Sequence, residues 1–320
     1  MSEQFVADVG GTNIRLARIA ADGLANIKKY ICRDYASIDL VIQQYFDELP
    51  EYQFSGGCLA IACPVTGDHV AMTNHSWAFS QQALRLQLKL KDLYVINDFT
   101  AVAYSLPVLH DNQVVQIGEG TAKENGNIAV FGPGTGLGVE HITMTASGWQ
   151  TLDGEGGHVD FAPIDETDIL VWRYLQKKHG RASAEEVMSG RGIVNIYNAL
   201  SEHRSTPTKF NNPAEITAAA LSGECDTCEA TLTQFCRIMG SFAGNIALNM
   251  ATTGGIFIGG GIANRFTDFI QQSDFRARFE AKGIMKHYVK SIPTYLIAEP
   301  DHGLLGAAAF LKQHIVSSTK

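Results

Sequence analysis

The sequence lacks an apolar run long enough to cross a bilayer, and it does not open with the basic and apolar segment of a secretory signal. It also lacks an excess of basic residues, because 25 Lys and Arg stand against 33 Asp and Glu, for a net charge of −8. An acidic chain is a poor partner for nucleic acid or for an anionic membrane surface. We therefore expect a cytoplasmic protein that binds neither nucleic acid nor a membrane.

Cysteine is scarce and lacks the spacing of a disulfide framework, so free thiols are expected in a reducing cytosol. Cys225 and Cys228 are spaced like half of a zinc site, but only Cys236 lies near them as a further ligand and no histidine follows at ligand spacing. A redox pair would need a thioredoxin-like context, which is absent. We expect a helix start with core packing at this pair, and no structural zinc.

The usual nucleotide-binding motifs are missing as well. The sequence contains no P-loop and no protein-kinase signature set. What it does contain is the composition of an ordinary globular protein, with 45% apolar and 18% charged residues, and a length of 320 residues that fits one or two domains. Strands followed by helices recur in both halves of the chain, which indicates an α/β fold. Ser37, Ser80 and Asn212 are expected helix caps, and the longest helical pattern covers residues 226–250.

Two glycine turns of the same design stand about 120 residues apart. The first is Asp8-Val9-Gly10-Gly11-Thr12-Asn13 and the second runs from Gly132 to Gly138. Each follows an apolar strand and leads into another strand, which argues against a dinucleotide-binding fold. Glycine allows φ > 0 and brings backbone N–H groups close to an anion, so each turn is a candidate phosphate site or simply a hairpin turn.

Five segments together resemble the bacterial glucokinases, the ATP-dependent hexose kinases of the actin, sugar kinase and chaperone ATPase superfamily. These segments are Asp8 to Asn13, Ile96 to Ala101, Gly132 to Gly138, Gly154 to Phe161 and Gly259 to Gly261, and residues 72–77 match as well. The resemblance implies a two-lobed actin-like ATPase (ribonuclease H-like) α/β fold with a cleft between the lobes. It assigns residues 1–108 and 301–320 to a small lobe and residues 109–300 to a large one. It also implies a homodimer.

The activity that the resemblance implies is transfer of the ATP γ-phosphoryl group to the 6-hydroxyl of glucose. Asp98, which follows an apolar strand, is the expected catalytic base, because a carboxylate within hydrogen-bond reach can take the hydroxyl proton. Taken by itself, Asp98 could equally be the cap of the helix expected from Thr100 to Leu106. A kinase for another hexose or an aminosugar, and a non-catalytic sugar sensor, are the alternative functions.

ATP and Mg²⁺ are the implied co-substrate and metal. A carboxylate at Asp8 can hold Mg²⁺, directly or through water, and can alternatively cap its own turn. The residues expected around the nucleotide are Ala7, Asp8, Val9, Gly10, Gly11, Thr12, Asn13, Gly134, Thr135, Gly136, Gly259, Gly260 and Gly261.

The expected glucose-binding residues offer carboxylate, amide and imidazole groups, which suit hydroxyls that both donate and accept. They are Asn74, Asn97, Asp98, Glu155, His158 and Glu185. Ser183 and Glu186 have the spacing of a capping box, which would occupy Glu186 at a helix start and leave Glu185 for the sugar. The cysteine-rich zinc motif and the helix-turn-helix of the related sugar-responsive repressors are missing from this sequence, which favours the glucokinases without zinc.

Overall fold

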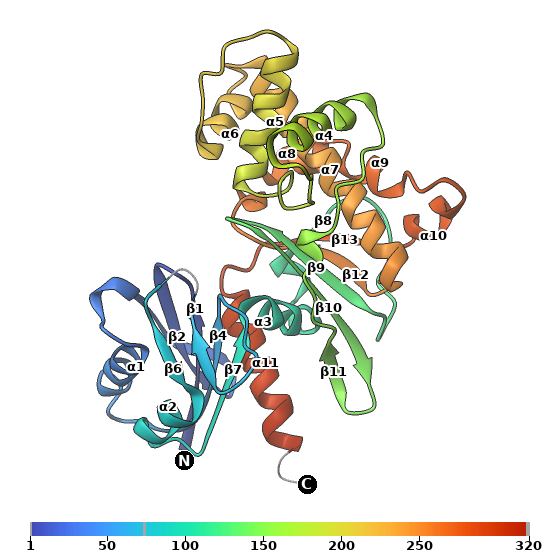
Figure 1. Cartoon of the computed structure of the whole chain (residues 1–320). Coiled ribbons are helices and arrows are strands. Elements are labelled where there is room, and N and C mark those ends of the chain that lie inside the picture. The colour runs from blue at the N-terminus through green and yellow to red at the C-terminus, as the bar shows by residue number, and fades with distance from the viewer. Residues whose placement is uncertain (1, 73–74, 318–320) are drawn as a thin grey trace. The chain divides into compact units, whose positions relative to one another are not determined.

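A computed structural model describes residues 2–72 and 75–317 of the chain (Figure 1). By its internal contacts the chain divides into two compact units. The first unit comprises Met1–His110 and Glu299–Lys320, and the second comprises Asp111–Ala298. Whether these units are the two lobes expected from the sequence stays a prediction.

The first unit is built on a five-stranded sheet in the order β3-β2-β1-β4-β7. Strands β1 and β2 form an antiparallel hairpin around the first glycine turn, whereas β1, β4 and β7 run parallel. The strands of this sheet are β1 (Ser2–Val9), β2 (Asn13–Ala20), β3 (Gly23–Ile31), β4 (Gln53–Ile61) and β7 (Asp92–Asn97). A separate two-stranded sheet pairs β5 (His69–Ala71) with β6 (Ala78–Ser80).

Helices cover both faces of this sheet, because neighbouring residues along a strand point to opposite sides. Phe5 and Ala7 of β1 belong to the core that is shared with α1 (Ile38–Asp47) and α2 (Gln81–Gln87). Val6, on the other side, belongs to the core that is shared with α3 (Asp98–Ser105) and α11 (His302–Ser317). The helix at the far end of the chain therefore packs in the N-terminal unit. Two 3₁₀ turns complete the unit, η1 (Cys32–Asp34) and η2 (Leu106–Val108).

The second unit repeats the same sheet plan. Its order is β11-β10-β9-β12-β13-β8, with β9, β12 and β13 parallel and the β9–β10 hairpin antiparallel. This confirms the predicted repeat of a strand hairpin around a glycine turn. The strands are β8 (Val114–Gln116), β9 (Ile128–Pro133), β10 (Leu137–Thr145), β11 (Gly148–Thr151), β12 (Gly255–Ile258) and β13 (Thr294–Ile297).

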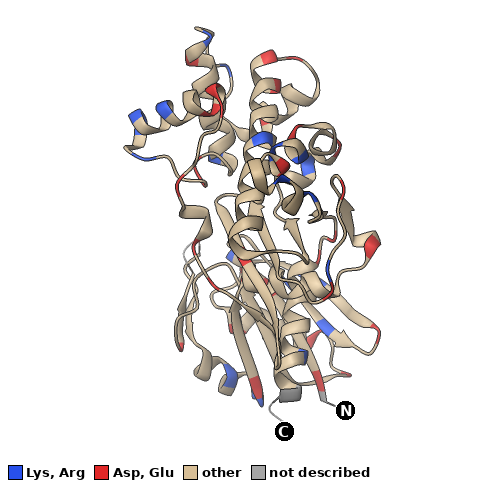
Figure 2. Ribbon diagram, turned by 90° about the vertical axis from the view of Figure 1, so that its right-hand side faces the viewer, with Lys and Arg blue, Asp and Glu red and all other residues tan. Residues whose placement is uncertain are grey.

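One continuous core joins this sheet to the helices of the second unit, with α7 (Asp226–Met250) at its centre. The other helices are α4 (Glu166–His179), α5 (Gly190–His203), α6 (Pro213–Leu221), α8 (Thr267–Gln272), α9 (Phe275–Glu280) and α10 (Lys286–Lys290). The short 3₁₀ turns are η3 (Asp111–Gln113), η4 (Gly156–His158), η5 (Ala263–Phe266) and η6 (Gly283–Met285). Acidic and basic residues are interspersed among these helices (Figure 2). None of the helices within the described residues is long and apolar enough to span a membrane.

Several predicted helix ends are confirmed. Ser80 and Asn212 accept backbone N–H groups at the starts of α2 and α6, while Ser37 holds the cap position of α1 without a side-chain bond. The Cys225 sulfur accepts the Cys228 N–H at the start of α7, and Cys228 is buried, as the helix-start interpretation predicts. The helix after β7 begins at Asp98 rather than at the predicted Thr100.

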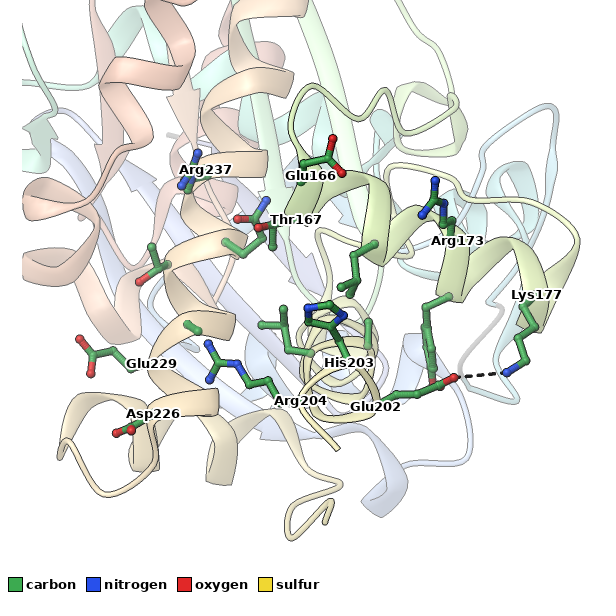
Figure 3. A pocket seen from close by; sticks show the side chains of 17 residues that line it. Glu166, Thr167, Arg173, Lys177, Glu202, His203, Arg204, Asp226, Glu229 and Arg237 are labelled. Carbon is green, nitrogen blue, oxygen red and sulfur yellow. Dashed lines mark hydrogen bonds and ion pairs between the residues drawn. The ribbon is translucent and has the colours of Figure 1, made fainter. Parts of the chain in front are cut away.

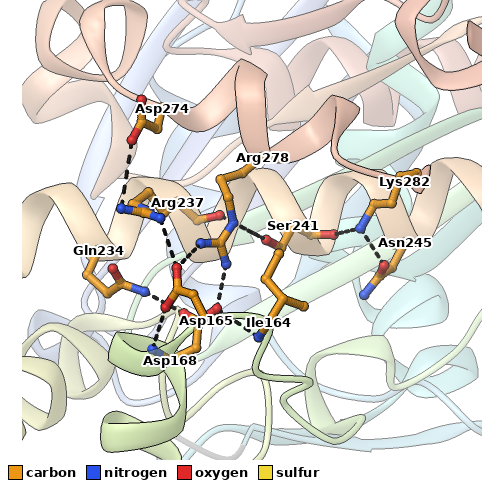
Figure 4. A network of polar contacts seen from close by, with 10 residues as sticks. All are labelled: Ile164, Asp165, Asp168, Gln234, Arg237, Ser241, Asn245, Asp274, Arg278 and Lys282. Carbon is orange, nitrogen blue, oxygen red and sulfur yellow. Dashed lines mark hydrogen bonds and ion pairs between the residues drawn. The ribbon is translucent and has the colours of Figure 1, made fainter. Parts of the chain in front are cut away.

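A buried network of charged groups fixes α4 against α7 and α9 (Figure 4). Arg278 of α9 pairs with Asp165 and Asp168, each at 2.5 Å, and Asp168 is fully buried. Asp168 also accepts a hydrogen bond from Gln234 of α7 and one from the backbone N–H of Ile164 at 3.1 Å. Because Ile164 ends the segment that holds the predicted sugar residues Glu155 and His158, the network anchors one end of that segment.

Asp168→Ala is expected to lower the free energy of unfolding by about 3–5 kcal/mol, because it removes the fully buried carboxylate partner of Arg278 and leaves that buried charge with the more exposed Asp165 alone. The matched control is Glu202→Ala, which removes an exposed partner of Lys177 and should cost less than about 1 kcal/mol. Urea denaturation of both variants measures the difference. Similar losses in the two variants would contradict the anchoring role.

Candidate functional site

In the first unit, the predicted residues gather at one edge of the sheet. The strand register sets Val9 beside Ile61 and Ile61 beside Asn97, so the carboxyl ends of β1, β4 and β7 are level. Asp8 is the next-to-last residue of β1, and Asp98 directly follows β7. Ligands of α/β sheets bind outside the carboxyl ends of parallel strands, so both carboxylates lie where a ligand is expected.

Asp98 is the first residue of α3, and the cap of that helix is its neighbour Asn97, whose Oδ1 accepts the Phe99 N–H at 2.9 Å. Asp98 Oδ1 accepts the same N–H at 3.0 Å, so Asp98 shares in the capping that was its alternative role. Burial raises the pKa of Asp98 to about 6, and the nearby Asp8 carboxylate adds to the rise, while the Phe99 amide opposes it. This pKa suits a base that must take and release a proton near neutral pH.

Asp8 is held by an arginine that sequence reasoning missed. Asp8 and Arg15 face each other across the β1–β2 hairpin, and Arg15 Nη2 donates to Asp8 Oδ2 at 2.5 Å. Arg15 Nη1 donates to Asp301 Oδ1 and to the Pro300 carbonyl, both at 2.8 Å. The signal was present in the sequence, because a short hairpin turn fixes which residues are opposite.

The Asp8 carboxylate fits the requirement of a magnesium ion only in part. Its Oδ2 accepts from Arg15. Within the part of the chain that the structure describes, no side chain hydrogen-bonds its Oδ1. Gly303 lies so close that an added Cβ would come within 3.2 Å of the carboxylate carbon. A hard cation takes oxygen ligands and keeps several waters, so one carboxylate oxygen is enough for contact directly or through water.

Asn97 retains capacity for a sugar. Its Nδ2 donates to the Cys63 carbonyl at 3.2 Å and its Oδ1 serves the Phe99 N–H. The Asn97 side chain also hydrogen-bonds the Asp98 carboxylate, so its N–H donors are in use, and one of the two lone pairs of its oxygen stays open. Asn74, the other predicted sugar residue of this unit, lies outside the described residues.

In the second unit, the glycine turn and the last glycine segment lie side by side. The register sets Ile258 beside Phe131, and Gly259 N–H donates to the Phe131 carbonyl at 2.8 Å. A Cβ on Gly260 would lie 2.6 Å from the Pro133 carbonyl oxygen, and Gly260 has φ +83°. Both close approach and backbone angle therefore require glycine at this position.

The expectation of positive φ at the glycines of the two turns is wrong, whereas the approach of an anion that their missing Cβ would allow stays a prediction. Gly10, Gly134 and Gly136 adopt backbone angles outside the left-handed region. At Gly136 the cause is space, because a Cβ would lie 2.6 Å from Glu185 Oε2. Around Gly134 there is open room, with the nearest heavy atom 3.9 Å from a Cβ position.

The structure brings the three predicted sugar residues of the second unit together through the backbone. The segment 157–161 runs beside residues 182–185, with Glu185 N–H donating to the Gly157 carbonyl at 2.9 Å. Glu155 precedes η4 and His158 is its last residue, and the His158 N–H donates to the Glu155 carbonyl at 3.0 Å. Their side chains are exposed, whereas that of Glu185 is largely buried, with 17% exposed.

The predicted capping box at Ser183 is wrong, because no helix starts there. Ser183 forms a β-bridge with Asp160, and α5 begins at Gly190 with Ser189 as its cap. Glu186 instead accepts from Asn195 Nδ2 at 2.9 Å and from Arg191 Nη2 at 2.8 Å. Glu186 is still occupied by the protein itself, but α5 supplies the partners.

Comparison with known proteins assigns the chain to a family. A family model named Glucokinase matches residues 5–314. The chain is 48% identical to a glucokinase of Colwellia psychrerythraea over 317 residues, which covers 97% of this chain and 96% of that one. It is 47% identical to a glucokinase of Escherichia coli over 311 residues, with 97% of each covered.

The chain belongs to the glucokinase family. A crystal structure of glucokinase from an Antarctic psychrotroph matches with a TM-score of 0.92 at 38% identity, and 98% of this chain and 99% of that chain are covered. A ROK family glucokinase of Streptomyces griseus, solved with glucose and AMPPNP, matches with a TM-score of 0.64 at 17% identity, covering 98% of this chain and 100% of that one. This second likeness shows the fold alone. Together they confirm the fold class that the sequence predicts.

A hollow of about 950 Å³ in this glucokinase-family chain contains none of the predicted site residues. It lies between α4, α5 and α7, where acidic and basic side chains such as Arg173, Arg204 and Glu229 alternate (Figure 3). An ion pair of 3.3 Å joins Lys177 to Glu202 at its edge. Volume alone therefore does not locate the functional site of this unit.

Glu140 is a buried carboxyl beneath the segment that carries Glu155, and sequence reasoning missed it. It has 4% of its surface exposed, and its Oε1 accepts the His141 N–H at 2.8 Å. Burial raises the pKa of Glu140 to about 7, against the effect of the His141 amide, and a hydrogen bond to Asp153 together with the charges of Asp153 and Glu155 adds to the rise. Glu140 thus binds a proton in the native state under conditions where the unfolded chain has lost it.

Glu140→Gln is expected to stabilise the protein in a pH-dependent way. The native state keeps the proton up to about pH 7, against an ordinary value of 4.5, so stability falls as the pH rises through that window. Glutamine is neutral throughout, so the melting temperature of the variant should exceed that of wild type by several degrees at about pH 8 and by little at about pH 5.

The control for this experiment is Glu124→Gln, which changes an exposed carboxylate. Thermal denaturation of wild type and both variants at the two pH values measures the effect. A stability difference for Glu140→Gln that stays constant with pH would contradict the buried proton.

Proposed function

We propose that this chain transfers the γ-phosphoryl group of ATP to the 6-hydroxyl of glucose, giving glucose 6-phosphate and ADP. Membership of the glucokinase family supports the reaction. The observation that carries it is Asp98, a partly buried carboxyl at the carboxyl edge of the first unit's sheet with a pKa of about 6. Two relatives at 48% and 47% identity that are named glucokinase support glucose as the acceptor.

In the proposed reaction Asp98 accepts the proton of the sugar 6-hydroxyl while the hydroxyl oxygen bonds to the γ-phosphorus. The bond from that phosphorus to the bridging oxygen breaks, and ADP leaves with the electron pair. Phosphoryl transfer needs positioning and charge stabilisation more than covalent help. The partly desolvated Asp98 suits the role because its affinity for a proton exceeds that of an ordinary aspartate.

The nucleotide is proposed to bind through backbone N–H groups of the two glycine turns and against Gly259 to Gly261. Asp8 would hold Mg²⁺, directly or through water, and a bound magnesium ion supplies charge neutralisation for the phosphates. Arg15 keeps the Asp8 carboxylate in one orientation, because its guanidinium is always charged and donates in a fixed geometry.

Glucose is proposed to bind to Asn74, Asn97 and Asp98 of the first unit and to Glu155, His158 and Glu185 of the second. The open acceptor position of Asn97 and the exposed side chains of Glu155 and His158 support this assignment. The homodimer and the cytoplasmic location are proposed on the family likeness.

Asp98→Asn is expected to lower kcat by about 10²–10⁴-fold while glucose binding is kept, because the amide preserves the shape but accepts no proton. Calorimetry with glucose verifies that the variant is folded and binds. Asp47→Asn, a change on the exposed side of α1, is the control and should leave kcat unchanged. Near-normal kcat in Asp98→Asn would exclude Asp98 as the base.

The pH profile provides a second measurement on Asp98. The base acts only when ionised, so kcat/KM for glucose at saturating ATP should fall tenfold per pH unit below about pH 6, where Asp98 gains its proton. A profile that stays flat down to about pH 5 would contradict the assignment.

A coupled assay of ADP release over a panel of hexoses and aminosugars tests the function itself. Glucose as the best substrate supports the proposal. A preference for another sugar favours a kinase of different specificity, and sugar binding without ADP release favours a sensor. Either of these results would overturn the proposed function.

A further inference from the structure

The Glu185 carboxylate lies directly against the second glycine turn. The backbone N–H of Leu137 donates to Glu185 Oε2 at 3.0 Å. At Gly136 the contact is so close that a Cβ would lie 2.6 Å from the same oxygen. A hydrogen bond of 2.9 Å from the Gly190 N–H to the Gly134 carbonyl joins the start of α5 to this turn. An amide donor at the turn is therefore already occupied by an anion.

The charge of Glu185 is only partly compensated. Its Oε1 accepts from Arg191 Nη2 at 2.8 Å, but the same nitrogen lies 2.8 Å from Glu186 Oε1. One guanidinium thus serves two carboxylates. Asn195 holds Glu186 without adding charge, and His179 lies 3.6 Å from Glu186. With His179 neutral, the group retains one net negative charge beside the turn.

We propose that Glu185 has a second role, in which it keeps the turn 132–138 from binding polyphosphate until a sugar hydroxyl engages its carboxylate. The inference rests on the proposed function, in which Glu185 binds glucose. A polyphosphate needs the N–H groups that point from such a turn, and a carboxylate in contact with one of them both occupies the donor and repels the anion.

A bound sugar would weaken both effects of the Glu185 carboxylate, its hold on the Leu137 N–H and its repulsion of an anion. Hydroxyls that donate to Glu185 compete with the Leu137 N–H for the carboxylate and draw on its negative charge. The two substrates then bind with positive coupling, and this coupling is reciprocal by thermodynamic necessity. Glu185 would thereby reduce the binding of ATP when no acceptor is present, which limits hydrolysis by water.

The test compares AMPPNP binding by calorimetry in wild type, Glu185→Gln and Glu186→Gln, each with and without saturating glucose. In wild type, glucose should raise the affinity for AMPPNP about fivefold or more. Glu185→Gln keeps the shape and removes the charge, so its sugar-free affinity should exceed that of wild type about fivefold, and glucose should then have little further effect. Glucose itself should bind more weakly to this variant.

Glu186→Gln is the matched control, because Glu186 shares Arg191 with Glu185. Within the described residues, the hydrogen bond to the turn comes from Glu185 and none comes from Glu186. It should change sugar-free affinity less than Glu185→Gln does and should retain the effect of glucose. The proposal is overturned when Glu185→Gln binds AMPPNP no more tightly than wild type, or when both variants behave alike.

Failure of the proposed function gives a different result. A wild-type protein that binds neither glucose nor AMPPNP contradicts the proposed function. Inorganic tripolyphosphate then serves as the probe of the turn in the same three proteins. Tighter tripolyphosphate binding by Glu185→Gln than by Glu186→Gln supports the second role, and equal binding overturns it.

Discussion

Parallel pairing of strands is the constraint on which the functional residues of both units depend. In the first unit β1, β4 and β7 run parallel, and in the second β9, β12 and β13 do. Parallel strands end at the same edge, so residues that are distant in sequence become neighbours. In the first unit this brings Asp8 close to Asp98. In the second unit it brings Gly259 beside Phe131, which directly precedes the turn 132–138.

The pKa values of the carboxyls in the two units follow from their surroundings rather than from residue type. Asp98 and Glu140 are both carboxyls with raised pKa values, and in each burial is the largest cause, with a second carboxylate close by. Asp165, in contrast, has a lowered pKa although burial opposes it, because backbone N–H and Arg278 contacts stabilise its charge. A buried carboxylate that pairs with a guanidinium, such as Asp165, therefore has a lowered pKa, whereas Asp98 and Glu140 have raised pKa values and hold a proton more readily.

The sequence predicted the sheet hairpins and several helix starts, because these are set by local signals such as an apolar strand before glycine or a cap residue before a helix. The start of α3 was placed at Thr100 instead of Asp98, since Asn97 and Asp98 both resemble a cap. The capping box at Ser183 failed because tertiary pairing with Asp160 overrides a local helix signal.

Other features could not be read from the sequence. The raised pKa of Glu140 depends in part on Asp153 and Glu155 in the segment that follows β11, and nothing near Glu140 in sequence indicates them. The hydrogen bond between the Leu137 N–H and the Glu185 carboxylate joins residues 48 positions apart, and local sequence patterns do not encode such a contact. Arg15 is the exception, because it is placed opposite Asp8 by the hairpin register alone.

The two glycine turns share a feature beyond their backbone. Beside each turn stands a carboxylate held by an arginine: Asp8 by Arg15 and Glu185 by Arg191. A guanidinium donates its N–H groups in a fixed planar geometry, so it limits the orientations of that carboxylate. The environments then differ in one respect, because Arg15 also binds Asp301, whereas Arg191 also binds Glu186. In both cases one cation is divided between two anions, so a negative charge remains beside each turn, and a cation or a hydroxyl donor can offset it.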